Sequence, residues 1–193
     1  MTICVAIGVN DCLVFAADSA STLQGVNEKG ESEIVNVYDH GDKVYNLYKG
    51  LPIAAMTCGM GNIGVYSISN LAKTFRSRLS GSDPEWRVDV ENYSIEEIAT
   101  KARKFFFEEK FRAIVPAPPS PHSFEFYIGG YSSGEGSLHE LWQISIVNGA
   151  SSAPVQMGAQ GWVGAMWAGQ PGPLNRLLTG FALAGPCASW HNN

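Results

Sequence analysis

Two short apolar stretches at the start of the chain constrain its fold more than any other feature. The first runs from Ile3 to Val9 and the second from Cys12 to Asp18, and only Asn10-Asp11 separates them. Asn and Asp are residues that tight turns between paired strands prefer. We therefore predict a β-hairpin here, so the fold begins with β-structure.

Two later segments have the periodicity of amphipathic helices. The first is expected over 62–79, and the second is expected to open at Ser94, where Glu97 three residues on completes a capping box. The four-residue spacing of Ile63, Leu71, Phe75 and Leu79 gives the first helix an apolar face, and Ile95, Ile98, Ala102 and Phe105 give one to the second.

The order of the remaining segments completes the fold prediction. Stretches of β-strand length lie at 34–38, 43–48, 51–58, 123–131, 138–147 and 155–157. A Pro-rich loop occupies 116–121, and a last helix is expected over 174–183. Strands, two helices, strands and a helix, with no internal repeat and no linker, predict one α+β domain over residues 1–193.

Composition narrows the function classes. The 193 residues have a formal net charge of −5 and no basic stripe with interleaved aromatics, which argues against nucleic-acid binding. No stretch approaches the roughly 18 apolar residues of a membrane span. The four cysteines lack CxxC spacing and the four histidines lack paired ligand spacing. We therefore expect a reduced, cytoplasmic protein without a metal or other cofactor.

Thr2 supplies the main chemical hypothesis. A small second residue permits removal of Met1, which would leave Thr2 with a hydroxyl and a free α-amine on one residue. Such an amine can act as the base for its own hydroxyl, so no separate His is needed. A Met-Thr start does not by itself indicate such a nucleophile. The evidence for it comes from the segments downstream.

Three short segments follow Thr2 in a defined order. They are Ala16-Ala17-Asp18-Ser19, then Asp42-Lys43-Val44-Tyr45-Asn46-Leu47, then Ala54-Ala55-Met56-Thr57-Cys58-Gly59 ahead of a helix. In this order the chain resembles the proteasome β-subunit family of N-terminal nucleophile hydrolases, most clearly over the first 80 residues. Lys43 lies further along than is usual in that family, and we expect the additional residues within 25–42 to form a polar loop.

The resemblance implies a fold and a set of roles. The fold would be a four-layer αββα sandwich with truncated or divergent C-terminal elements. Thr2 would be the nucleophile, Lys43 would lower the pKa values of its amine and hydroxyl, and Asp18 would hold Lys43 in place. A backbone N–H after the strand would stabilise the oxyanion, with Gly59 as first candidate and Cys58 as the alternative.

The same resemblance implies a threonine-type endopeptidase that cleaves peptides or unfolded proteins. Ser19 and Ser21 would lie near the site, and Tyr45 and Met56 would line the pocket for the side chain before the cut. The subunit would work in a homo-oligomeric ring or helical assembly, for which an ATPase is a candidate partner.

Three other functions stay open. If Met1 is retained, Thr2 has no free amine, and the chain would be a non-catalytic structural subunit. The same Thr2 chemistry could instead serve a small-molecule amidase that works as a small oligomer. The third is a metal site, whose candidate ligands follow no EF-hand pattern: Asp18, Glu28, Glu31 and Glu33.

Overall fold

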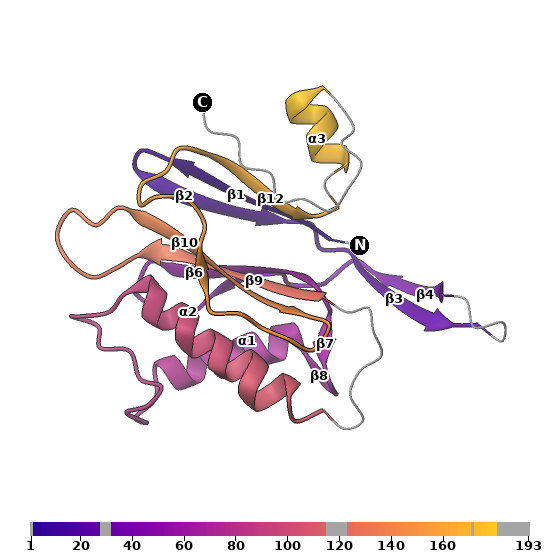
Figure 1. Cartoon of the computed structure of the whole chain (residues 1–193), viewed down its shortest axis with the longest axis horizontal. Helices are drawn as coiled ribbons and strands as arrows, with labels where there is room; N and C mark the ends of the chain where they lie inside the picture. Colours follow the sequence, from indigo (N-terminus) through magenta and orange to yellow (C-terminus); the bar gives the residue numbers. More distant parts are fainter. Residues whose placement is uncertain (1, 28–31, 115–122, 171, 181–193) are drawn as a thin grey trace.

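The structure, a computed structural model, describes residues 2–27, 32–114, 123–170 and 172–180. It is a mixed α+β fold, as predicted. Helices α1 (Ile68–Leu79) and α2 (Ile95–Arg103) cover one face of a five-stranded sheet, and a three-stranded sheet lies on the other face (Figure 1). Beyond the three-stranded sheet the described residues contain one helix, α3 (Gly172–Thr179), so a complete second helix layer is not confirmed.

The three-stranded sheet has the order β12–β1–β2 and is antiparallel. Its strands are β1 (Ile3–Val9), β2 (Cys12–Ala17) and β12 (Gly164–Gly169), so the N-terminal hairpin is confirmed. Strand β12 was not predicted, because its Gly and Ala residues have weak strand preference and only pairing with β1 makes this segment extended.

The five-stranded sheet has the order β11–β10–β9–β6–β5, with antiparallel neighbours throughout. Each of these strands begins and ends within two residues of its predicted bounds. They are β5 (Val44–Asn46), β6 (Ile53–Gly59), β9 (Ser123–Tyr131), β10 (His139–Val147) and β11 (Val155–Gln156).

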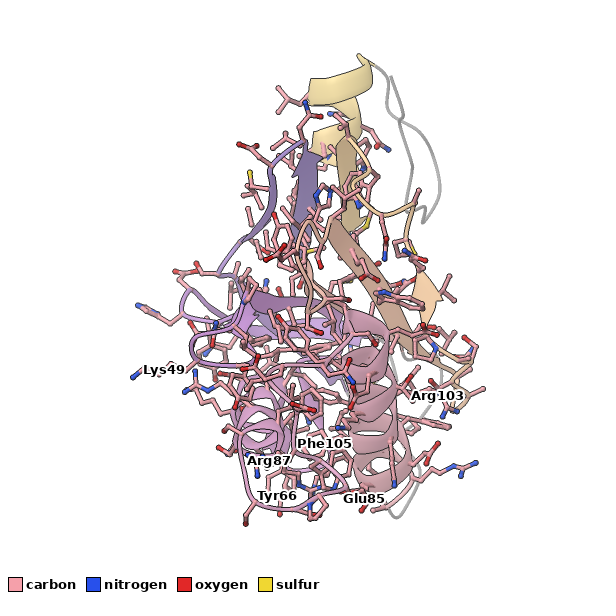
Figure 2. The ribbon with its side chains drawn as sticks, turned by 90° about the vertical axis from the view of Figure 1, so that its left-hand side faces the viewer. Lys49, Tyr66, Glu85, Arg87, Arg103 and Phe105 are labelled. Atoms are coloured by element: carbon pink, nitrogen blue, oxygen red, sulfur yellow. The ribbon has the colours of Figure 1, made fainter. Side chains whose placement is uncertain are left out.

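The helix layer buries the main hydrophobic core. Helix α2 begins as predicted, since the Ser94 hydroxyl accepts the N–H of Glu97 at 3.1 Å. It continues directly into a π-helix, η1 (Lys104–Phe111), whose wider turn buries three consecutive residues, Phe105 to Phe107. Figure 2 shows Phe105 between the helices, where its ring stacks on Phe75 of α1 at 5.4 Å between centroids.

Helix α1 starts six residues later than predicted. Two short paired strands, β7 (Asn62–Ile63) and β8 (Tyr66–Ser67), occupy the expected first turns. The hydroxyl of Ser67 then caps the helix by accepting the N–H of Asn70 at 3.2 Å. This cap, rather than the earlier apolar Ile63, sets where the helix begins.

The prediction of a polar loop within 25–42 is wrong. Strands β3 (Ser21–Val26) and β4 (Ser32–Tyr38) pair with each other and form a two-stranded arm that projects from the body (Figure 1). The sequence predicts the second strand but not the first, which is too polar to show a hydrophobic pattern. The predicted loop at 116–121 and the end of the predicted last helix lie outside the described residues.

Candidate active site

Asp18 and Lys43 meet beside the start of β1. The Lys43 Nζ donates to Asp18 Oδ1 at 2.8 Å and also to the carbonyl of Ala20. The same Asp18 oxygen accepts the backbone N–H of Ile3 at 2.8 Å. Lys43 is only 8% exposed. The Asp18 and Ala20 oxygens hold its Nζ at a fixed place next to the start of β1.

The environment keeps Asp18 ionised. Burial alone would raise the pKa of this carboxyl, but hydrogen bonds from Lys43 and from the Ile3 N–H, together with the Lys43 charge, outweigh burial. The pKa of Asp18 therefore lies below its ordinary value. Asp18 thus presents a carboxylate to the Lys43 Nζ, with which it forms an ion pair at 2.8 Å.

Thr2 lies between the ends of two strands. It directly precedes β1, and its carbonyl accepts the N–H of Gln170 at 2.8 Å, just after β12. Gly169 has a φ of +91°, and a Cβ there would come within 2.0 Å of the Thr2 carbonyl oxygen. The glycine therefore allows the end of β12 to fix the backbone of Thr2.

Thr2, Lys43 and Gly59 line one cavity of about 300 Å³. One wall comes from the base of the arm, another from the end of β6, and a third from the start of α1. The remaining lining residues are Ser21, Thr22, His40, Gly41, Asp42, Tyr45, Thr57, Cys58, Met60, Gly61, Ser67, Ile68 and Ser69.

The cavity includes some expected residues and leaves out others. Ser21 and Tyr45 line it as expected, whereas Ser19 and Met56 do not. Met56 is fully buried between the two sheets. Asp18 supports the cavity from behind through Lys43 rather than lining it.

Gly59 ends β6 at the cavity with a φ of +92°. A Cβ there would come within 2.2 Å of the Ser123 carbonyl oxygen, which accepts the Met60 N–H at 2.8 Å. The fold itself therefore requires a glycine at this position, since any side chain would strike β9 and strain the backbone.

A polar network lies behind the cavity wall. Oε2 of Glu125 accepts from the Cys58 thiol at 3.1 Å and from the Tyr127 hydroxyl at 2.7 Å. Burial, followed by the Glu125 charge, raises the pKa of Cys58, and burial raises the pKa of Cys4 to about 12. Both thiols therefore stay protonated at neutral pH and are not thiolate nucleophiles.

Several lining residues were missed by sequence reasoning. His40 and Asp42 reach the cavity because the arm returns to the body there, and no local pattern indicates that return. Ser67 and Ser69 come from the start of α1, which the sequence placed too early. The Ser67-x-x-Asn70 spacing, with a cap residue in front of the apolar face, was the available signal.

The metal site considered from the sequence concerns Asp18, Glu28, Glu31 and Glu33. No three His, Cys, Asp or Glu side chains gather within the described part of the chain as a metal site would require. Of the four candidate ligands, Asp18 bonds Lys43, while Glu28 and Glu31 lie outside the described residues. No described helix has the length and apolarity needed to cross a membrane.

Comparison with known proteins gives one informative match. A chain from the structure "Helical Assembly of the Anbu Complex from Pseudomonas aeruginosa" superposes with a TM-score of 0.52 at 15% sequence identity. The match covers 95% of this chain and 68% of that chain. No family model matches the sequence, and no curated protein matches it. At this identity the similarity establishes an Anbu-like α+β fold.

These comparisons correct the family expectation. The prediction that the chain is a member of the proteasome β-subunit family is wrong, because no family model matches and what is found is a likeness of fold. The expectation depended on short segments within the first 80 residues. Those segments are short, and they lie at the end of β2, across β5 and along β6.

Proposed function

We propose that this chain, once Met1 is removed, is an amide hydrolase that uses Thr2 as an N-terminal nucleophile and cleaves peptide bonds. The observation that carries the proposal is the Asp18–Lys43 pair, because it holds a buried cation in the wall of the cavity that Thr2 also lines. An ammonium next to an α-amine favours the neutral amine, which is the form that can accept a proton.

In the proposed reaction, the Thr2 hydroxyl oxygen adds to the substrate carbonyl carbon while its proton passes to the Thr2 α-amine. The C–N bond then breaks, the leaving amine takes that proton, and the acyl group remains as an ester on Thr2. Water, deprotonated by the same amine, hydrolyses the ester and restores the site. The α-amine has an ordinary pKa of about 7.7–8.0, so a modest decrease makes it a base at neutral pH.

The oxyanion needs donors on the opposite side of the cavity. The end of β6 supplies the backbone of Cys58 and Gly59, and we propose the Gly59 N–H as donor, with the Cys58 N–H as alternative. The start of α1 also lines this cavity and has no acidic residue in its first turn. A helix N-terminus favours negative charge, which supports an oxyanion at this position.

We propose that the fold is a reduced N-terminal nucleophile hydrolase sandwich. The packing of two sheets with helices on one side supports this assignment. The second helix layer would be represented by α3, which contacts the outer face of β12 through a hydrogen bond from Trp167 Nε1 to Asn175 at 2.9 Å.

We also propose that the chain self-associates. The Anbu complex of similar fold forms a helical assembly. An ATPase partner and a cytoplasmic location stay predictions from the sequence.

A small-molecule amidase is the second candidate, and the size of the cavity favours it. About 300 Å³ lies at the lower end of sites that take small ligands. A peptidase should turn over peptide amides of several lengths, whereas an amidase should prefer one small acyl group and lose activity as the substrate is extended.

The test is hydrolysis of a panel of fluorogenic peptide amides by the protein, Thr2→Ala and Thr2→Ser. Thr2→Ala should lose turnover by on the order of 10³-fold or more, since it removes the nucleophile. Thr2→Ser should keep measurable turnover, because it retains both hydroxyl and amine. Equal turnover by the protein and Thr2→Ala, with both folded, would refute the assignment of the nucleophile.

A further inference from the structure

The cavity that Thr2 lines contains one charge that is not balanced. With histidine counted as neutral, its charged lining residues are Asp42 and Lys43. Lys43 pairs with Asp18 at 2.8 Å, so their two formal charges cancel. Asp42 forms no ion pair within the described part of the chain. Asp42 therefore gives the cavity a net negative charge, which attracts a positively charged group.

The backbone at Asp42 is held in place from several sides. The Asp42 carbonyl accepts the hydroxyl of Tyr45, and the carbonyl of Lys43 accepts the N–H of Thr57 at 3.0 Å. Tyr45 is itself buried, and its ring stacks on Phe126 of β9. The side chain of Asp42 is exposed, so it can meet a ligand while its backbone stays fixed. A group that is fixed in advance loses little freedom when a ligand binds.

The Asp42 charge is felt within the cavity. Burial, followed by the Asp42 charge, raises the pKa of Tyr45, which lines the same cavity. The carboxylate is therefore close enough to act on a neighbouring lining residue. Ser21 and Ser69 also line the cavity, and a hydroxyl oxygen can accept an N–H from a cationic group.

We propose that the cavity selects a substrate with a positively charged side chain next to the cleaved amide, and that Asp42 pairs with this charge. The substrate class is then an amide of a lysine-like or arginine-like residue. A cavity of about 300 Å³ suits one such residue better than several. The inference rests on the proposed hydrolase function, because it names the substrate of the same cavity. Asp42 would determine specificity and would take no part in the proton transfers.

Other substrate side chains fit the cavity less well. An acidic side chain would meet the Asp42 carboxylate, and the Lys43 Nζ that could offset this repulsion already donates to Asp18 and to the Ala20 carbonyl. An apolar side chain would cover part of the Asp42 carboxylate without giving it a partner, which costs free energy. A cationic side chain avoids both penalties.

The experiment measures binding to the full chain with Thr2→Ala, which lacks the nucleophile and leaves the ligand intact. The two ligands are arginine and citrulline, each acetylated at the amine and amidated at the carboxyl. Their side chains have nearly the same shape, but only that of arginine is charged. Affinities are measured by titration calorimetry at low and high salt.

Two further proteins complete the series. The first adds Asp42→Asn to Thr2→Ala, which keeps the shape of the side chain and removes its charge. The second adds Asp39→Asn instead and is the matched control. Asp39 is an exposed acid three residues earlier in the chain, and it does not line the cavity.

We expect Thr2→Ala to bind the arginine ligand about fivefold to tenfold more tightly than the citrulline ligand, as for one charge-assisted contact that water partly screens. This preference should decrease at high salt. Asp42→Asn should abolish the preference, and Asp39→Asn should keep it.

Equal affinities for the two ligands, or no binding of either at millimolar concentration, would overturn the proposal. So would a preference that survives Asp42→Asn, because the charge would then be recognised elsewhere on this acidic chain. A preference lost equally in Asp42→Asn and Asp39→Asn would indicate a general effect of net charge and would also contradict it. None of these results depends on turnover, so a failure of the hydrolase assignment is distinguishable from a failure of charge selection.

Discussion

The two sheets of this molecule differ in what covers their outer faces. The five-stranded sheet lies under α1, α2 and η1, and aromatic rings fill the space between them. The three-stranded sheet is contacted by α3 at β12, and elsewhere on its outer face Ile7, Val9 and Val14 are each between 37% and 47% exposed. We infer that the packing of the helices on the five-stranded sheet, called the helix side below, provides most of the stability. The three-stranded sheet, called the thin side, holds Thr2 at the start of β1.

The largest effect expected from this comparison is a loss of stability when the core of the helix side is damaged. Phe106 is fully buried, and its ring centroid lies 4.7 Å from that of Phe126 and 5.1 Å from that of Phe105. Phe106→Ala should lower the free energy of unfolding by about 3–5 kcal/mol, because it leaves a cavity among packed rings. Urea unfolding measures this change. Leu177→Ala, at a side chain that is 79% exposed, is the control and should change little.

The second effect is a loss of activity, and it is expected from a change at Lys43, beside Thr2 on the thin side. Lys43→Met keeps the length and apolar stem of the side chain but removes the ammonium. Turnover of a peptide amide should fall by about 10²-fold or more, since the base loses the charge that tunes it. The pH profile should also move to higher pH, because the α-amine returns toward its ordinary pKa. Unchanged turnover and an unchanged profile would mean that Lys43 has only a structural role.

A smaller effect is expected from the partner of Lys43. Asp18→Asn retains an oxygen that can accept the Ile3 N–H but removes the negative charge beside Lys43. At pH 7 the variant should be about 1–3 kcal/mol less stable.

The pH dependence of that difference follows from the lowered pKa of Asp18. A carboxyl whose pKa is lower in the folded protein stabilises it fully above the unfolded pKa, about 3.9, and loses this contribution as pH falls through the folded value. The stability difference between the protein and Asp18→Asn should therefore persist from neutral pH to about pH 5 and shrink below pH 4. A difference that is constant down to pH 2 would contradict the role of charge.

The smallest effect is expected on the outer face of the three-stranded sheet. Ile7 pairs directly with Val14, and both side chains are more than 40% exposed. Replacing each by Ser in turn should change the free energy of unfolding by less than about 1 kcal/mol. Thermal unfolding of the two variants is sufficient to measure it. A loss of several kcal/mol would show that this face is covered, and the contrast between the two sheets would no longer hold.

Sequence patterns predicted the elements whose stability is local. The hairpin of β1 and β2 follows from alternating apolar residues around Asn10-Asp11, and the start of α2 follows from Ser94 and Glu97. Elements that depend on distant pairing were missed. Strand β12 exists because it pairs with β1, some 160 residues earlier, and η1 departs from the 3.6-residue period that the helix prediction assumed.

The candidate site likewise has a part that was expected from the sequence and a part that was not. The proximity of Asp18 and Lys43 was expected from resemblance, and the structure has them 2.8 Å apart. The cavity walls from the arm and from the start of α1 were not expected, because they depend on where a long hairpin returns and on a helix cap. Catalytic roles for Thr2, Asp18, Lys43 and Gly59 stay predictions.

The most direct test of the central claim is the intact mass of the purified protein, with N-terminal sequencing, before and after treatment with an epoxyketone probe that requires a free N-terminal threonine. We predict a chain that begins at Thr2 and gains the mass of one probe, while Thr2→Ala gains none. A chain that keeps Met1 and does not react would contradict the account, and the protein would then be a structural subunit with the fold but without the chemistry.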